Sequence, residues 1–316
     1  MFIRPMFRLV PDGTKIKFMR GRFLGLAVSA ILSTLSIALF FYPGLNLGLD
    51  FKGGIVLEVR TPTPANFNQL RQDLAAKGVA DAEVQRFGAD TEVLVKIAAQ
   101  KSEAATQSTI DTARATLIAS APGTKVMSAD AVGASVSSEL FQKGLLALGI
   151  SLAMILVYIW FRFEWEFAVG AVATLILDVT KTIGFLVITR LPFDLVMVAA
   201  ILTIIGYSTN DKVVVYDRMR ENLRKYKTMP LRELIDLSIN ETLSRTIATS
   251  STVFLAALPL ALFGGASLSA FAFTMLFGIV VGTTSSIFIA APILLLLGEH
   301  RLRRDIAPAK PAVRKK

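Results

Sequence analysis

The sequence predicts an α-helical protein that crosses a membrane six times, with one small α+β domain between the first and second crossings. The 316 residues are 53% hydrophobic and 18% charged, with a mean hydropathy of +0.57, whereas soluble domains are about 25% charged. The segment 246–298 contains no charged residue. As one helix it would run about 80 Å, far beyond the roughly 30 Å of a bilayer core, so it must hold at least two spans.

Six apolar segments are long enough to cross a bilayer. The first, 23–42, follows Arg20 and Arg22, and it is too long for the apolar region of a cleavable signal peptide. The last, 268–298, is longer than the about 25 residues of an ordinary span, so it tilts, kinks at Pro292 or extends past the bilayer. Residues 264–267 form the turn before it. The other four predicted spans are 144–161, 167–189, 195–216 and 246–263.

The polar segment between the first two spans has its own pattern. Short β-rich runs alternate with two helical segments in the order β-α-β-β-α-β, which is typical of a ferredoxin-like domain. Gly88-Ala89-Asp90 is the hairpin signal between the second and third strands. That fold hosts many activities, so it indicates none by itself. The predicted strands are 55–59, 82–87, 92–97 and 125–131, and the predicted helices are 66–77 and 103–118.

The distribution of charge predicts the orientation. Six spans put both termini on one side, and that side carries 21 Lys and Arg residues, whereas segment 43–139 holds 9 of them against 11 Asp and Glu. The positive-inside rule therefore predicts cytoplasmic termini and a periplasmic domain. The net charge of +10 needs no nucleic acid to explain it, although the basic tail could also touch membrane lipids. The predicted divisions are a cytoplasmic arm (1–22), span 1 (23–42), a periplasmic domain (43–140), spans 2–6 (141–298) with a cytoplasmic loop at about 217–245, and a basic tail (299–316).

Several chemistries are excluded by composition. The chain has no cysteine and one histidine, His300, which lies in the basic tail. A thiolate metal site, a histidine-based zinc site and a Ser/His/Asp triad therefore lack their residues. No G-x-x-x-x-G-K-[ST] sequence is present, so no P-loop for ATP is expected. We expect no metal, no cofactor and no enzymatic activity, and any work must draw on another energy source.

Four charged residues fall inside the predicted spans, where each costs about 2.5–3.5 kcal/mol and is a functional candidate by default. Asp178 and Lys181 are three residues apart, on one face of the third span. The simpler interpretation is an ion pair that lets the helix insert. The alternative is that Lys181 pairs with a carboxylate on another helix.

Asp211 lies in the run Gly206-Tyr207-Ser208-Thr209-Asn210-Asp211, with Lys212 beside it. We place Tyr207 and Ser208 on the face of Asp211, where they could hold water or bind the carboxylate. A buried aspartate balanced between desolvation and a nearby cation can load and release a proton. A pair with Lys212 is the simpler alternative, but neighbours in a helix point about 100° apart. Arg245 opens the fifth span, where it either tunes a carboxylate or reaches the interface.

Four strings resemble the SecF family, accessory subunits of the bacterial Sec protein-export machinery. Gly48-Leu49-Asp50-Phe51-Lys52-Gly53-Gly54 is similar to the family signature after the first span. The run from Gly206 to Asp211, continued to Asn222, is similar to the fourth span. Ser244-Arg245-Thr246 is similar to the start of the family's fifth span. The run from Ser285 to Pro292 is similar to part of its sixth span.

The resemblance implies half of an assembly like the RND transporters, paired with SecD, that assists late preprotein export by using the proton motive force. It implies contacts with the SecYEG channel, YajC, YidC and the moving preprotein in the bacterial inner membrane. The proposed proton-coupling residues of the family match Asp211 and Arg245, with Asn210 beside them. Asp178 matches an acidic position, and Lys181 is the cation on its face.

The glycine motif also has a physical interpretation. Gly53 and Gly54 permit unusual backbone angles where the chain leaves the membrane. The motif, with Gly48, Asp50 and Phe51, is either a hinge that couples span movement to domain movement or a simple tight turn. Two rival functions also remain open: a small-molecule proton antiporter of the RND type, and a passive scaffold for SecD and the channel.

Overall fold

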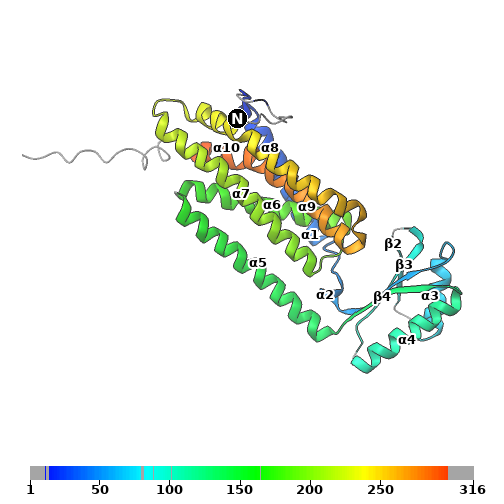
Figure 1. The fold of residues 1–316 in the computed structure, drawn as a ribbon. Coiled ribbons are helices and arrows are strands. Elements are labelled where there is room, and N and C mark those ends of the chain that lie inside the picture. Colours follow the sequence, from blue (N-terminus) through cyan, green and yellow to red (C-terminus); the bar gives the residue numbers. More distant parts are fainter. Residues whose placement is uncertain are drawn as a thin grey trace, which may run out of the picture.

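The computed structural model describes residues 11, 14–79, 82–87, 89–100, 102–163 and 165–297. It consists of a helical bundle with a small α/β domain at one end (Figure 1). The basic tail with His300, Gly88 of the predicted hairpin, and residues 1–10, 12 and 13 of the N-terminal arm lie outside the described residues.

Among the described residues, six helical segments are long and apolar enough to cross a membrane, which confirms the predicted number of spans. The last is interrupted by a π-helical turn. Their bounds are α1 Arg22–Phe41, preceded by a 3-10 turn Phe18–Gly21; α5 Ala134–Arg162; α6 Trp165–Thr189; α7 Leu195–Lys225; α8 Leu231–Phe263; and α9 Gly265–Ser285, which continues through Ser286–Ala290 into α10 Ala291–Leu297.

Two boundaries predicted from the sequence fall within helices. The expected loop 217–245 is mostly helix, because α7 runs to Lys225 and α8 begins at Leu231. The expected domain boundary at 140 lies inside α5, which begins at Ala134. The physical reason is the same in both places, since charge ends a membrane span but not a helix. At 31 residues, α7 is about 46 Å long, so it extends well past a hydrocarbon core of roughly 30 Å.

The α/β domain confirms the ferredoxin-like prediction. Its order is β1, α3, β2, β3, α4, β4, and the sheet order is β2-β3-β1-β4 with every pair antiparallel. The strands are β1 Gly54–Arg60, β2 Glu83–Phe87, β3 Ala89–Ile97 and β4 Lys125–Val132, and the helices are α3 Phe67–Ala76 and α4 Glu103–Ser120.

Strand alternation builds the domain core. Ile55, Leu57 and Val59 point to the helix-covered face, and Leu57 lies opposite Val95 of β3. Leu74 of α3 and further side chains of α4 complete this core. The core is separate from the clusters of the helical bundle. The domain is therefore stabilised by its own hydrophobic burial.

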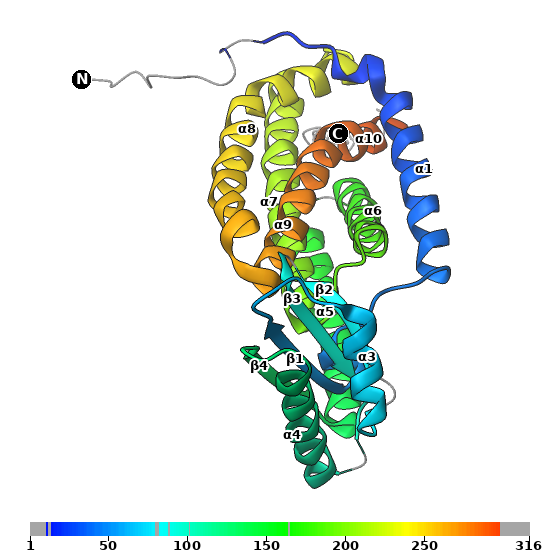
Figure 2. The ribbon, with the colours of Figure 1, turned by 90° about the vertical axis from the view of Figure 1, so that its right-hand side faces the viewer.

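In the bundle, α6, α7 and α9 supply most of the interior, while α1 and α8 lie on opposite sides of it (Figure 2). Helix α1 approaches α6 closely, because a Cβ added at Gly184 would collide with Ser36. Leu24, Ile31 and Phe41 of α1 are exposed, as expected for side chains that face lipid or a partner subunit.

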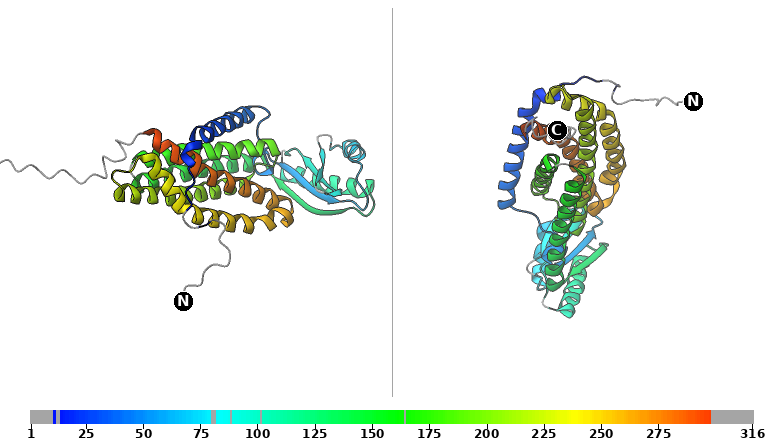
Figure 3. Two further views of the ribbon diagram at one scale, coloured as in Figure 1. Left: turned by 90° about the horizontal axis from the view of Figure 1, so that it is seen from above. Right: turned by 90° about the vertical axis from the view of Figure 1, so that its left-hand side faces the viewer.

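Part of the N-terminal arm is fastened to α8. The amide of Met19 donates to Asp236 Oδ1 at 2.8 Å, and Asn240 exchanges two hydrogen bonds with the backbone of Ile16 at 3.0 and 2.9 Å. Met19 is fully buried. The right-hand view of Figure 3 shows the N-terminal segment crossing the end of the bundle remote from the α/β domain. Its described residues therefore have a packing role as well as a charge.

Replacement of Leu57 by alanine should unfold the α/β domain at lower denaturant. Leu57 is fully buried, so the change removes a core side chain and leaves a cavity, at a cost of about 2–5 kcal/mol. Ile118→Ala is the matched control, because Ile118 is 43% exposed on α4 and should cost under about 1 kcal/mol. Pulse proteolysis of the full chain over a urea series measures both. Equal midpoints for the two variants would contradict the assigned core.

Candidate functional site

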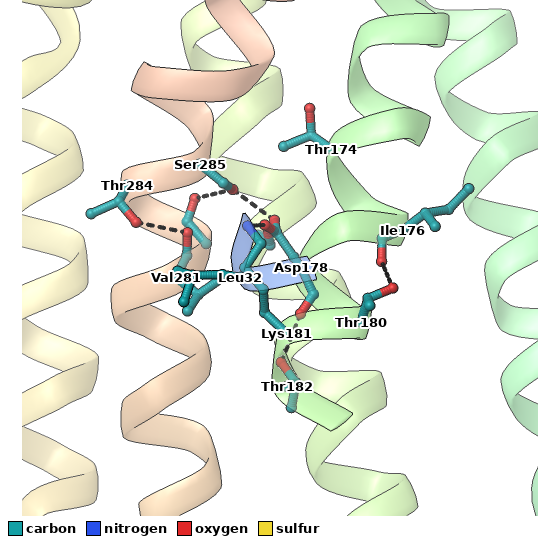
Figure 4. A network of polar contacts seen from close by, with 12 residues as sticks. Leu32, Thr174, Ile176, Asp178, Thr180, Lys181, Thr182, Val281, Thr284 and Ser285 are labelled. Atoms are coloured by element: carbon teal, nitrogen blue, oxygen red, sulfur yellow. Dashed lines mark hydrogen bonds and ion pairs between the residues drawn. The ribbon is translucent and has the colours of Figure 1, made fainter. Parts of the chain in front are cut away.

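The centre of the bundle holds a carboxylate shared by two lysines. On α6, Asp178 pairs through Oδ1 with Lys181 Nζ at 3.3 Å, and through Oδ2 with Lys212 Nζ of α7 at 2.8 Å. The hydroxyls of Ser208 and Ser285 donate to the same Oδ2 at 2.8 and 2.6 Å. Figure 4 shows Ser285 and Lys181 converging on Asp178. One carboxylate thus joins α6, α7 and α9.

This cluster is withdrawn from solvent. The side chains of Asp178, Lys181 and Lys212 are 1%, 6% and 1% exposed. Lys212 Nζ also contacts the hydroxyl of Ser208 and, at 3.3 Å, its carbonyl oxygen. The three charges sum to +1 if all are ionised. A buried charge is tolerated only when it is paired and hydrogen-bonded. Asp178 therefore offsets the cost of burying the two ammonium groups of Lys181 and Lys212.

The structure decides between the alternatives for these residues. The predicted Asp178–Lys181 pair is confirmed, and the alternative in which Lys181 pairs with another helix is wrong. The partner of Asp178 on another helix is Lys212, for which the sequence suggests only Asp211 as a partner. One feature of the sequence does indicate this contact: Ser208 precedes Lys212 by four residues, so the two side chains lie on the same helix face. The placement of Ser208 beside Asp211 is correspondingly wrong, because its hydroxyl binds Asp178.

Asp211 lies on another face of α7 and lines a cavity of about 110 Å³. Its Oδ2 atom is buried and accepts no hydrogen bond from the residues that the structure describes. The hydroxyls of Ser286 and Thr246 lie near the carboxylate. Arg245 lines the same cavity, but no salt bridge joins it to Asp211 within the described chain. The cavity is lined by Tyr207, Asn210, Asp211, Val214, Arg245, Thr246 and Thr249.

A hydroxyl chain leads away from this cavity. The Tyr207 hydroxyl donates to Ser250 Oγ at 2.7 Å, and Ser250 is 2.8 Å from Thr283 Oγ1. Tyr207 is therefore on the Asp211 side of α7, as predicted. Helix α7 has two polar faces: one is filled by the paired charges around Asp178, and the other opens onto the Asp211 cavity. Hydroxyls that both donate and accept can pass a proton to a carboxylate.

The glycine motif binds the start of α7. Gly48 N donates to Phe193 O at 2.8 Å, and Phe193 N donates to Asn46 O at 2.7 Å. Asp50 Oδ2 accepts from the amide of Leu195, the first residue of α7, at 3.1 Å. Such acceptance satisfies a free helix N–H and suits the positive end of the helix dipole. The segment before the α/β domain is thus fastened to the helix that carries Asp211.

Two carboxylates meet at this helix end. Asp194 caps α7 by accepting from the amide of Met197 at 3.0 Å. Burial raises the pKa of the Asp194 carboxyl above its ordinary value, and the nearby Asp50 carboxylate raises it further. This end of α7 therefore brings the carboxylates of Asp50 and Asp194 close to each other.

The two glycines after the short helix α2 (Leu49–Lys52) occupy backbone angles that other residues avoid. Gly53 and Gly54 have φ values of +71° and +126°, and a Cβ on Gly54 would collide with the carbonyl of Ile97. Phe51 packs its ring 5.3 Å from Phe141 and 5.4 Å from Phe193, measured between centroids. The unusual backbone angles predicted for these glycines are therefore confirmed, while the hinge role stays a prediction.

Comparison with known proteins agrees with this architecture. The family model described as "Protein export membrane protein SecD/SecF, C-terminal" matches residues 113–300, and the model "SecD/SecF GG Motif" matches residues 38–65. This chain belongs to the SecD/SecF family. The protein translocase subunit SecF of Rickettsia bellii is 42% identical over 305 residues, covering 96% of this chain and all of the relative.

Fused SecDF proteins are also similar to this family member. The protein translocase subunit SecDF of Brucella abortus is 43% identical over 96% of this chain and 40% of the relative. The crystal structure of SecDF from Thermus thermophilus, described as a translocon-associated membrane protein, gives a TM-score of 0.83 at 34% identity over 93% of this chain, and SecDF in a super-membrane-facing form gives 0.69. The chain spans 40% of the first of these structures. It therefore has the fold of one half of SecDF, the RND-like membrane fold that the sequence predicts.

No group of three or more His, Cys, Asp or Glu residues that could hold a metal ion occurs in the described part of the chain.

Replacement of Gly54 by alanine should disturb the junction between α2 and β1. The new Cβ would meet Ile97 O and would require a left-handed backbone, which costs about 1–3 kcal/mol. Gly133→Ala is the matched control, since nothing lies within 4 Å of a Cβ there. Pulse proteolysis of the full chain should show easier cleavage for Gly54→Ala alone. Unchanged cleavage of that variant would argue against the tight turn.

The cluster around Asp178 predicts an asymmetry between its members. Asp178→Asn leaves two buried ammonium groups without a counter-charge and should cost about 3–5 kcal/mol. Lys212→Met leaves the Asp178–Lys181 pair intact and should cost much less. Fluorescence-detected gel filtration after heating compares the two, with the exposed Asp130→Asn as control. An equal loss of folded protein in both cluster variants would show that the carboxylate is not the shared counter-ion.

Proposed function

We propose that this SecF-family subunit works with SecD to couple the proton motive force to the late steps of preprotein export, without covalent chemistry on its substrate. The observation that supports the proposal best is the Asp211 cavity. It places a buried carboxylate near an arginine within a membrane span without an ion pair between them. Such a carboxylate can take up a proton without first breaking an ion pair.

Charge balance gives the proposal a mechanism. With Asp211 ionised, Asp178, Lys181, Lys212 and Asp211 sum to zero around one section of α7. A proton on Asp211 leaves a net positive charge there and weakens the attraction between α7 and Arg245 of α8. Helices that carry an unbalanced buried charge gain by repacking or by admitting water. In this proposal Asp178 and Lys181 contribute to coupling because their charges set the local charge balance that protonation of Asp211 changes. Asn210 lines the same cavity as Asp211.

The glycine motif supplies the mechanical link. Asp211 is 16 residues from Leu195 along one continuous helix, which is about 24 Å. That end of α7 is bonded to Gly48 and Asp50 through the hydrogen bonds of Phe193 and Leu195. A shift of α7 would therefore move the root of the α/β domain directly. One charge crossing 100 mV supplies about 2.3 kcal/mol, enough to bias a two-state domain position about fiftyfold.

The proposal includes an orientation and partners. The positive-inside rule supports cytoplasmic termini and a periplasmic α/β domain in the bacterial inner membrane. Fused SecDF relatives support SecD as the other half of the assembly. We propose that SecYEG, YajC and YidC lie beyond that pair, and that the emerging preprotein is the substrate of the domain's movement.

Preprotein export by cells whose only copy carries Asp211→Asn tests the coupling role. Asparagine keeps the size and polarity but cannot ionise, so we expect lost export with normal protein level and normal SecD co-purification. Asp211→Glu is the matched control and should keep part of the activity, because it retains a titratable group. Normal export by Asp211→Asn would favour a passive scaffold. A change in drug susceptibility without an export defect would favour a small-molecule exporter.

A further inference from the structure

A second cavity, of about 520 Å³, lies at the end of the bundle remote from the α/β domain. It is formed where α5 ends beside the extended part of α7, and four of its six lining residues are cationic. The lining residues are Arg162, Asp217, Arg220, Glu221, Arg224 and Lys225. The five residues from α7 are spaced at i, i+3, i+4, i+7 and i+8, which puts them on one helix face.

Both carboxylates of this cavity are paired with arginines, although Arg218, the partner of Glu221, also binds Glu241 at 2.7 Å. Asp217 accepts from Arg162 Nη2 at 2.9 and 2.7 Å, and this pair fastens the end of α5 to α7. Glu221 pairs with Arg218 at 2.6 Å. Arg224 has neither a hydrogen bond nor an ion pair within the described chain, and Lys225 lies 5.0 Å from the ring of Tyr226. The cavity therefore presents cationic donors to an anion.

Exposed aromatic side chains lie in sequence next to the cavity, as expected where a bilayer meets water. Trp160 and Phe161 just before Arg162 are 70% and 90% exposed, and aromatic side chains of this kind mark the membrane interface. Arg224 is seven residues beyond Asp217 along α7, a rise of about 10 Å. Its Cβ tilts back toward the helix N-terminus and so toward the bilayer. The long side chain of Arg224 can therefore extend back toward the headgroup layer, which reaches roughly 5–8 Å from the hydrocarbon core.

We propose that this cavity binds the phosphate of an anionic phospholipid, with Arg224 and Lys225 as its donors. The acyl chains would lie along the exposed apolar side of α5, where Met154 and Val157 are 68% and 50% exposed. Arginine suits a phosphate because its planar guanidinium donates in a fork, and lysine adds a point charge. The phosphate group is shared by lipids and soluble anions, and the position beside exposed α5 favours the lipid.

Native mass spectrometry of the full chain in detergent, titrated with phosphatidylglycerol, tests the proposal. We expect tighter retention of phosphatidylglycerol than of phosphatidylcholine by the unaltered protein. The double variant Arg224→Gln/Lys225→Gln should bind phosphatidylglycerol about 25-fold more weakly, about fivefold for each lost charge. Both side chains are exposed, and gel filtration verifies that the variant is folded.

The matched control Lys15→Gln/Arg232→Gln removes the same charge from two exposed positions outside the cavity and should bind like the unaltered protein. An equal loss in the control would show attraction by overall charge rather than a site. Equal retention of the two lipids would also overturn the proposal. Displacement of phosphatidylglycerol by millimolar inorganic phosphate would assign the cavity to a soluble anion instead.

Discussion

The shared carboxylate of Asp178 is the contact on which the centre of the bundle depends. Lys181 and Lys212 both need a counter-charge that water cannot supply, and Asp178 serves both within 3.3 Å. Ser208 and Ser285 complete its coordination from α7 and α9. Because an unpaired charge in this region is costly, the relative positions of these three helices are fixed by electrostatics as well as by packing.

Helix α7 connects the Asp178 cluster to the Asp211 cavity, to the glycine motif and to the end of α5. One of its faces takes part in the Asp178 cluster, and another opens onto the Asp211 cavity. Its first residue is bonded to Asp50 of the glycine motif, and its last turns lie beside the end of α5. A single continuous helix therefore links the Asp211 carboxylate, the root of the α/β domain and the far end of the bundle, which is the route that the proposed coupling would use.

Glycines on the elements packed against α7 let those elements approach it closely, alongside the large side chains that fill the rest of the contact. A Cβ on Gly278 of α9 would collide with Ile204, and one on Gly48 would come within 2.8 Å of Asp194 Cβ. Small residues let helices in a membrane pack closely where the hydrophobic effect offers little driving force. The G-x-x-x-G run of the last span, Gly278 to Gly282, thus packs against α7.

The sequence alone determined the number of spans, the order of elements in the α/β domain and the positions of the buried charges. These follow from hydropathy, strand and helix periodicity and local turn signals, which are properties of neighbouring residues. It also predicted the Asp178–Lys181 pair, because a separation of three residues is a contact within one helix.

The tertiary structure decided what depends on residues far apart in the chain. Lys212 binds Asp178, 34 residues away, and not its neighbour Asp211, because a helix turns adjacent side chains to different faces. The motif at 48–54 meets α7 about 145 residues later. Hydropathy did not predict that α5, α7 and α8 extend beyond the membrane spans, because the extensions contain charged residues. Polar residues end a membrane span, but the backbone hydrogen bonds of the helix continue.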